Sequence, residues 1–149
     1  MTRANDGKQV SGEDYRGKVV ALYFGYTHCP DVCPTTLANL TDVIDKVKNP
    51  DFKVLFVTVD PERDDGATLM KYTRAFSKQV DGLRADNPND LAVLARRYRV
   101  AYSVTQGPPY EVMHANSVFF FDKKGEARLV TTDTTDTAAI AQDVKALLQ

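Results

Sequence analysis

The sequence has only two cysteines, no long hydrophobic run and almost no excess of charge of either sign. Two cysteines cannot form a disulfide scaffold, and a chain of 149 residues can bury a sufficient core without one. The longest nearly apolar run, residues 19–26, is far shorter than the roughly 20 residues that cross a bilayer. A formal net charge of -1 provides no global field that attracts nucleic acid or anionic lipid. We therefore expect a metal or a disulfide to serve function rather than folding, and partners to be recognised locally.

The sequence also lacks signs of division or of targeting. Its first ten residues are polar and contain no apolar segment of the kind found in a secretory signal. No internal repeat, low-complexity tract or Gly/Ser/Pro-rich linker interrupts it. We therefore expect a single domain over residues 1–149.

Hydrophobic patterns predict strands and helices that alternate along the first part of the chain. Residues 19–24 form a continuous apolar run, which is typical of a strand buried on both faces of a parallel sheet. Further strands are predicted at 52–59, 82–85, 117–121 and 127–130, and helices from after residue 34 to 48, from after residue 66 to 76, over 90–98 and up to 148. Residues 100–114 are expected to be irregular. This order predicts an α/β fold, a thioredoxin-like three-layer sandwich with a mixed central sheet.

Both cysteines lie where the first predicted strand leads into a helix. Ligands of open α/β sheets bind beyond the carboxyl ends of the strands, so Cys29 and Cys33 occupy a favourable place for chemistry. Cys33 falls in or next to the first helical turn, where free N–H groups and the helix dipole favour a thiolate. If the helical turn includes both residues, the C-x-x-x-C spacing puts the two sulfurs on one face, where they can bind one ion or form a disulfide. A structural disulfide and two buried thiols are the alternatives.

A histidine from a distant part of the sequence can join the two cysteines. His114 directly precedes the predicted strand 117–121, and in a thioredoxin-like sheet the chain that enters this strand passes over the cysteine loop. Two thiolates and one imidazole suit Cu(I), whereas Zn(II) also binds such groups but favours a fourth ligand. A hydrogen-bonded structural histidine is an equally good interpretation of His114. His28 is a rival ligand, but its adjacency to Cys29 favours a place beside the site or on the surface.

Acidic residues follow the second predicted strand. Asp60 ends this strand and is expected at the same edge of the sheet as the cysteines, where a carboxylate can tune or bind a harder, oxidised metal ion. Glu62, Asp64 and Asp65 are interpreted instead as acids that cap the helix that follows.

Two motifs now carry a resemblance to a known family. The segment FGYTHCPDVCP at residues 24–34 and the segment VDPERD at 59–64, followed by a histidine before an aromatic strand, closely resemble the Sco/SenC family over nearly the whole chain. Its members are copper-binding, thioredoxin-like assembly factors for cytochrome c oxidase. The resemblance implies copper, as Cu(I) or Cu(II), with Cys29, Cys33 and His114 as ligands and Asp60 beside them. Met113 departs from the family's pattern, because many members have aspartate directly before the histidine.

The resemblance further implies a copper metallochaperone for the copper-binding subunit of cytochrome c oxidase. Another copper chaperone or a thiol reductase is a further expected partner, and nucleic acid is not. Family members are usually held by an N-terminal membrane helix, so we expect such an anchor to precede this sequence. The expected location is the periplasmic side of a bacterial inner membrane. No heptad pattern or obvious apolar patch indicates more than a monomer.

The main alternative is a thiol-disulfide oxidoreductase that acts on cysteines of exported proteins. In that case Cys29 attacks and Cys33 resolves the mixed disulfide. Reductases of the thioredoxin type usually place a cis-proline opposite the thiols, where this sequence has His114, and the nearest prolines are Pro108 and Pro109. A peroxidase is a weaker third option: the Thr-x-Cys pattern of Thr27 and Cys29 resembles that of peroxiredoxins, but the proline that their motif carries upstream is absent here. An interaction domain with a permanent disulfide is the remaining alternative.

Overall fold

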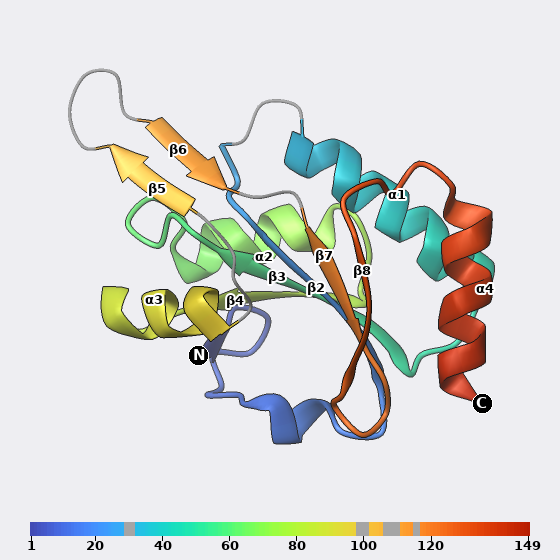
Figure 1. Cartoon of the computed structure of the whole chain (residues 1–149). Coiled ribbons are helices and arrows are strands. Elements are labelled where there is room, and N and C mark those ends of the chain that lie inside the picture. Colours follow the sequence, from blue (N-terminus) through green and yellow to red (C-terminus); the bar gives the residue numbers. More distant parts are fainter. Residues whose placement is uncertain (29–31, 98–101, 106–110, 115–116) are drawn as a thin grey trace.

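The computed structural model describes residues 1–28, 32–97, 102–105, 111–114 and 117–149, with the backbone alone at residues 32–33, 102–105 and 111–114. A six-stranded mixed sheet forms its centre, with the strand order β1-β4-β3-β2-β7-β8 (Figure 1). Strands β2, β3 and β4 are parallel neighbours, and the pairs β1·β4, β2·β7 and β7·β8 are antiparallel. The bounds of these strands are Thr2–Arg3 (β1), Val19–Gly25 (β2), Phe52–Thr58 (β3), Val80–Arg84 (β4), Val118–Phe121 (β7) and Ala127–Thr131 (β8).

Helices cover both faces of this sheet. One face packs against α1, α2 and α4, and the other packs against α3 and the short 3-10 helix η1. The bounds of these helices are Gly12–Tyr15 (η1), Val32–Val47 (α1), Gly66–Arg74 (α2), Pro88–Arg97 (α3) and Thr137–Leu148 (α4). The predicted three-layer α/β sandwich with a mixed sheet is therefore confirmed.

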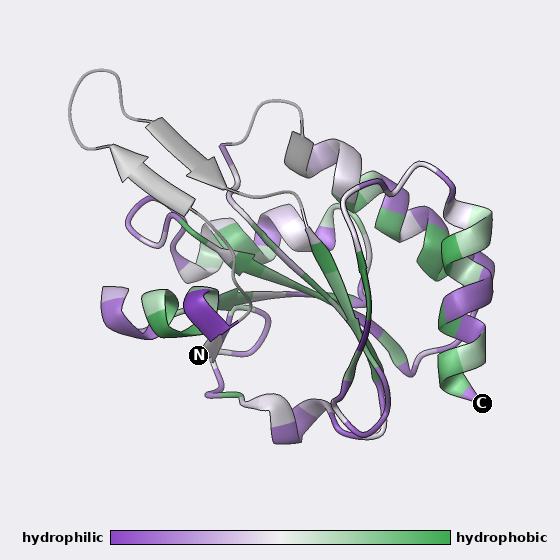
Figure 2. Ribbon diagram, viewed as in Figure 1, coloured by the Kyte–Doolittle hydropathy of each residue, from purple (hydrophilic) through white to green (hydrophobic). Residues whose placement is uncertain are grey.

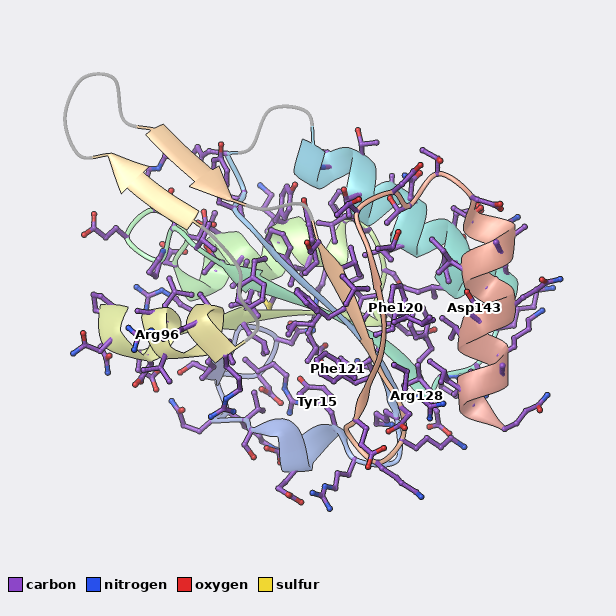
Figure 3. The ribbon with its side chains drawn as sticks, viewed as in Figure 1. Tyr15, Arg96, Phe120, Phe121, Arg128 and Asp143 are labelled. Carbon is purple, nitrogen blue, oxygen red and sulfur yellow. The ribbon has the colours of Figure 1, made fainter. Side chains whose placement is uncertain are left out.

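The central strands are apolar throughout because each of their faces meets a covered layer. All seven residues of β2 are buried, with alternate side chains in the two core clusters. Hydrophobic residues accordingly concentrate in the central strands (Figure 2). The same alternation sends Phe120 into the cluster under α1 and α4, whereas Phe121 packs against the cluster that contains Tyr15 (Figure 3).

The N-terminus of α3 shows how local chemistry sets an element's start. Asn87 accepts a hydrogen bond from the backbone N–H of Asp90 at 2.9 Å, which satisfies one of the free donors of the first turn. Pro88 takes the first helical position, where a missing N–H is tolerated. The helix therefore begins two residues before the predicted start at residue 90.

The expectation of an irregular segment at residues 100–114 is wrong in part. Tyr102–Thr105 (β5) and Glu111–His114 (β6) pair antiparallel in a separate two-stranded sheet. The rest of that segment, residues 100–101 and 106–110, lies outside the described residues. Both strands are short, and neither contains the continuous apolar run that marks the predicted strands 52–59 and 117–121. The polar N-terminus likewise gave no sign of β1, which exists because β4 offers it an edge.

No helix within the described ranges is long and apolar enough to span a membrane.

Hydrogen-bonded carboxylates predict a loss of stability in acid. The Arg3 guanidinium, by its hydrogen bonds, lowers the pKa of Asp6 to about 2, and the backbone N–H of Glu126 contributes most to lowering the pKa of Asp122. Since folding lowers these pKa values, their stabilisation is present above the unfolded value of about 3.9 and is lost as the pH falls through the folded value.

We therefore expect the urea midpoint of unfolding to decline as the pH falls from about 4 to about 2. The double variant Asp6→Asn, Asp122→Asn is expected to show a shallower decline, measured by far-ultraviolet circular dichroism. An equally steep decline in that variant would contradict the assignment of the effect to these two carboxylates.

Candidate metal centre

The loops that carry the two sequence motifs leave the sheet side by side. β2 and β3 are parallel neighbours that end in the pair Gly25 and Thr58. The backbone N–H of Val59 donates to the carbonyl oxygen of Gly25 at 2.8 Å, which continues the pairing past the end of β3. Because the carboxyl ends of parallel strands meet at one edge, the cysteine loop and the segment 59–64 start from the same place.

The structure describes the two cysteines unequally. Cys29 lies outside the described residues. The backbone of Cys33 occupies the second position of α1, so the prediction that this residue falls in the first helical turn is confirmed. The first turn of a helix lies at the positive end of the helix dipole.

His114 is the last residue of β6, and its backbone pairs with Tyr102. It comes four residues before Val118, which opens β7 and pairs with Tyr23 near the carboxyl end of β2. Four residues span at most roughly 14 Å, so covalent geometry keeps His114 within that distance of this edge of the sheet. The position of its side chain lies outside the description.

Asp60 is buried beside the same edge. Only 1% of its surface is exposed, and its Oδ2 accepts a hydrogen bond from Nε of Arg63 at 2.6 Å. Its backbone N–H donates to the hydroxyl of Thr58 at 3.0 Å. Just after the end of β3, this residue therefore places a carboxylate that is paired with the guanidinium of Arg63.

The interpretation of Asp64 as a helix-capping acid is wrong. Asp65 caps α2, because its carboxylate accepts the backbone N–H of Thr68 at 2.8 Å, and this hydrogen bond lowers its pKa. Asp64 is instead fully buried and faces the segment before the cysteines. It accepts hydrogen bonds from the backbone N–H and the hydroxyl of Thr27 at 3.0 and 2.5 Å, and from the hydroxyl of Thr58 at 2.6 Å. An acid one position before a capping residue gives no sequence signal that distinguishes these roles.

His28 lies between these groups and the solvent. Its side chain is 51% exposed, with Nδ1 3.7 Å from Oδ1 of Asp64 and 3.3 Å from the hydroxyl of Thr27. Ligand atoms of His28, Asp60 and Asp64 all fall within 4.8 Å of one another. The two carboxylates of this cluster already accept hydrogen bonds. We therefore interpret the cluster as polar side chains that stabilise the start of the cysteine loop.

Comparison with known proteins places this geometry in context. The profile of the SCO1/SenC family matches residues 2–149. The protein SCO1 homolog 1, mitochondrial, of Arabidopsis thaliana is 36% identical over 129 residues, which cover 85% of this chain and 38% of that protein. The chain thus spans less than half the length of this relative.

Solved structures agree over nearly the full chain. The crystal structure of Arabidopsis thaliana ScoI with copper bound superposes with a TM-score of 0.89 at 32% identity, covering 99% of this chain and 93% of the other. A structure described as identifying a disulfide switch in BsSco, a member of the Sco family of cytochrome c oxidase assembly proteins, superposes with a TM-score of 0.77 at 26% identity. That match covers 99% of this chain and 91% of the other. The chain belongs to the SCO1/SenC family.

Proposed function

We propose that this protein is a copper metallochaperone for the assembly of the copper centre of cytochrome c oxidase. One observation carries the proposal: the chain shares 99% of its length with a copper-bound Sco structure at a TM-score of 0.89. In the chain, the cysteine loop follows the carboxyl end of β2 and leads into α1, and β6 comes just before β7, which pairs with β2. The carboxyl end of such strands is where α/β sheets of this kind bind their ligands.

The proposed ligands are the sulfurs of Cys29 and Cys33 and the imidazole of His114. Thiolates and imidazole form a soft set of few donors that holds Cu(I) and leaves it accessible for exchange. The position of Cys33 in the first turn of α1 favours its thiolate. A partner then takes copper by replacing these ligands one at a time with its own. Asp60 contributes a carboxylate next to the ligands rather than a bond to Cu(I), since Nε of Arg63 already donates to it.

The proposed recipient is the copper-binding subunit of cytochrome c oxidase, and the proposed place is the periplasmic side of a bacterial inner membrane. An N-terminal membrane anchor in the full-length protein would hold this domain near that recipient. Another copper chaperone and a thiol reductase would supply the metal and keep the cysteines reduced. The domain is proposed to act as a monomer.

The oxidation state of the cysteine pair tests this function. When Cys29 and Cys33 give up two electrons and two protons to an added oxidant and form a disulfide, they lose the thiolates that bind the metal. We therefore expect the reduced protein to bind one Cu(I) tightly against a competing chelator under anaerobic conditions. The oxidised protein is expected to lose this binding and to regain it after reduction. Equal binding in both states would contradict the proposal.

A thiol-disulfide oxidoreductase remains the second candidate, because a cysteine in the first turn of a helix also suits a redox pair. It predicts rapid disulfide exchange, and a mixed disulfide between Cys29 and a substrate thiol that accumulates in Cys33→Ser. Weak Cu(I) binding together with that trapped species would favour the oxidoreductase.

A further inference from the structure

Asp64 is a buried carboxylate without a lysine or arginine partner among the described residues. Its exposed surface is 0%, and its two oxygens accept three hydrogen bonds from threonine groups. A buried charge is tolerated only where hydrogen bonds replace its lost hydration. The ordinary structural uses of an aspartate near a helix do not explain it, since Asp65 provides the cap of α2.

The three hydrogen bonds of this group, which we name the Asp64 anchor, join separate parts of the chain. Two of them hold the backbone and the hydroxyl of Thr27, and the third holds Thr58 at the end of β3. Thr27 lies two residues before Cys29 in the sequence. The anchor therefore fixes the last part of the described segment that leads to the first cysteine.

The backbone of the segment that carries Asp64 is itself held by further hydrogen bonds. Arg84, on β4, donates from Nε to the carbonyl oxygens of Pro61 and Asp64 at 3.1 Å each, and from Nη2 to that of Pro61 at 2.8 Å. The backbone N–H of Asp64 donates to the carbonyl oxygen of Asp60 at 2.9 Å. The backbone that carries the Asp64 carboxylate is thus hydrogen-bonded to the sheet through Arg84.

Direct binding of a metal by this cluster fits the geometry less well. Both oxygens of Asp64 accept hydrogen bonds from Thr27 and Thr58, and Oδ2 of Asp60 accepts one from Arg63, so an ion would compete with existing hydrogen bonds. A positioning role uses those hydrogen bonds as they stand.

We propose that Asp64 is a positioning residue for copper binding, acting through Thr27 on the segment that carries Cys29. The inference rests on the proposed function and names a residue that supports its ligands. Without the anchor, copper binding would have to fix Thr27 in place as well as form metal bonds, and affinity would fall. The number of ions bound and the identity of the ligands would remain the same.

The test compares Asp64→Asn with Asp81→Asn in the reduced protein. Asp81 is a matched control, because it is also buried and accepts hydrogen bonds from Tyr15, Lys53 and Asn5, away from the cysteine loop. We expect Asp64→Asn to lower the affinity for Cu(I) by about ten- to a hundredfold at one ion per chain, while Asp81→Asn keeps wild-type affinity. Thr27→Val is expected to lower the affinity for Cu(I) as Asp64→Asn does. Thr27→Ser, which retains the hydroxyl, is expected to keep wild-type affinity.

A second readout needs no metal. The backbone N–H of Thr27 is expected to exchange with deuterium about tenfold faster or more in metal-free Asp64→Asn than in the wild type. Wild-type affinity and wild-type exchange in Asp64→Asn would overturn the inference. The inference would also be overturned if the spectrum of the Cu(II) complex of Asp64→Asn showed the loss of an oxygen ligand, because Asp64 would then bind the metal itself. If Cys33→Ser left Cu(I) binding intact, the proposed function would fail instead, whatever the Thr27 exchange rate.

Discussion

Replacing Cys33 with serine is expected to lower the affinity of the reduced protein for Cu(I) by more than about a hundredfold. A serine hydroxyl stays protonated at neutral pH and offers a hard oxygen, which Cu(I) binds poorly. Cys29→Ser is expected to have the same effect for the same reason. Each variant is titrated anaerobically against a competing Cu(I) chelator, and the bound metal is counted per chain.

His114→Ala tests the third proposed ligand. We expect a loss of tight binding here as well, because two thiolates alone leave the ion without its imidazole. Thermal unfolding of the metal-free variants provides the control. Cys33 lies in the first turn of α1, and His114 ends a two-stranded sheet outside the central one, so neither change removes a residue of the described core clusters. Intact binding in His114→Ala would remove that residue from the ligand set and would leave the cysteines to be tested alone.

Phe56→Ala is expected to reduce the free energy of unfolding by about 3–5 kcal/mol, the largest effect on stability that we predict. Phe56 is fully buried in β3, with its ring centre 6.1 Å from that of Tyr23 and 5.6 Å from that of Tyr72. Its neighbour on β4 is Gly82, which has no side chain to fill a cavity. Leu69 already occupies the space above Gly82, since a Cβ there would lie 2.6 Å from Cγ of Leu69.

Such a loss is a large share of the roughly 5–15 kcal/mol that stabilises an ordinary domain. Urea unfolding at neutral pH measures it. Val93→Ala, at a residue of α3 that is 54% exposed, is the control and is expected to change stability by less than about 0.5 kcal/mol. A comparable loss in both variants would show that burial in β3 does not account for the effect of Phe56→Ala.

The sequence was informative where a single local pattern decides the structure. The apolar run at 19–24 predicted a doubly covered strand, and β2 is buried along its whole length. The sequence predicted Cys33 in or next to the first turn of a helix, and its backbone occupies the second position of α1. The ligand assignment to Cys29, Cys33 and His114 remains a prediction for copper titration to test.

The sequence was uninformative where structure depends on a distant partner. β1 is a polar pair of residues that becomes a strand only because β4 lies next to it. β5 and β6 are each four residues long and are stabilised by pairing with each other, so neither carries a clear pattern alone. These elements were missed because pairing, rather than intrinsic preference, determines them.

The acidic segment 60–65 contains both a residue whose role local sequence decides and one whose role depends on a distant partner. Local order was enough to expect a capping acid in this segment, and Asp65 is one, because its carboxylate accepts an N–H three residues later. The role of Asp64 depends on Thr27, which is 37 residues away in the sequence. By itself, the sequence determined the covered strands of the α/β sandwich, the place of Cys33 in the first turn of a helix and the family motifs, since periodicity and spacing are local properties. Only the tertiary structure decided which carboxylate turns toward the cysteine loop, because that depends on the parallel pairing of β2 and β3, which brings their carboxyl ends together.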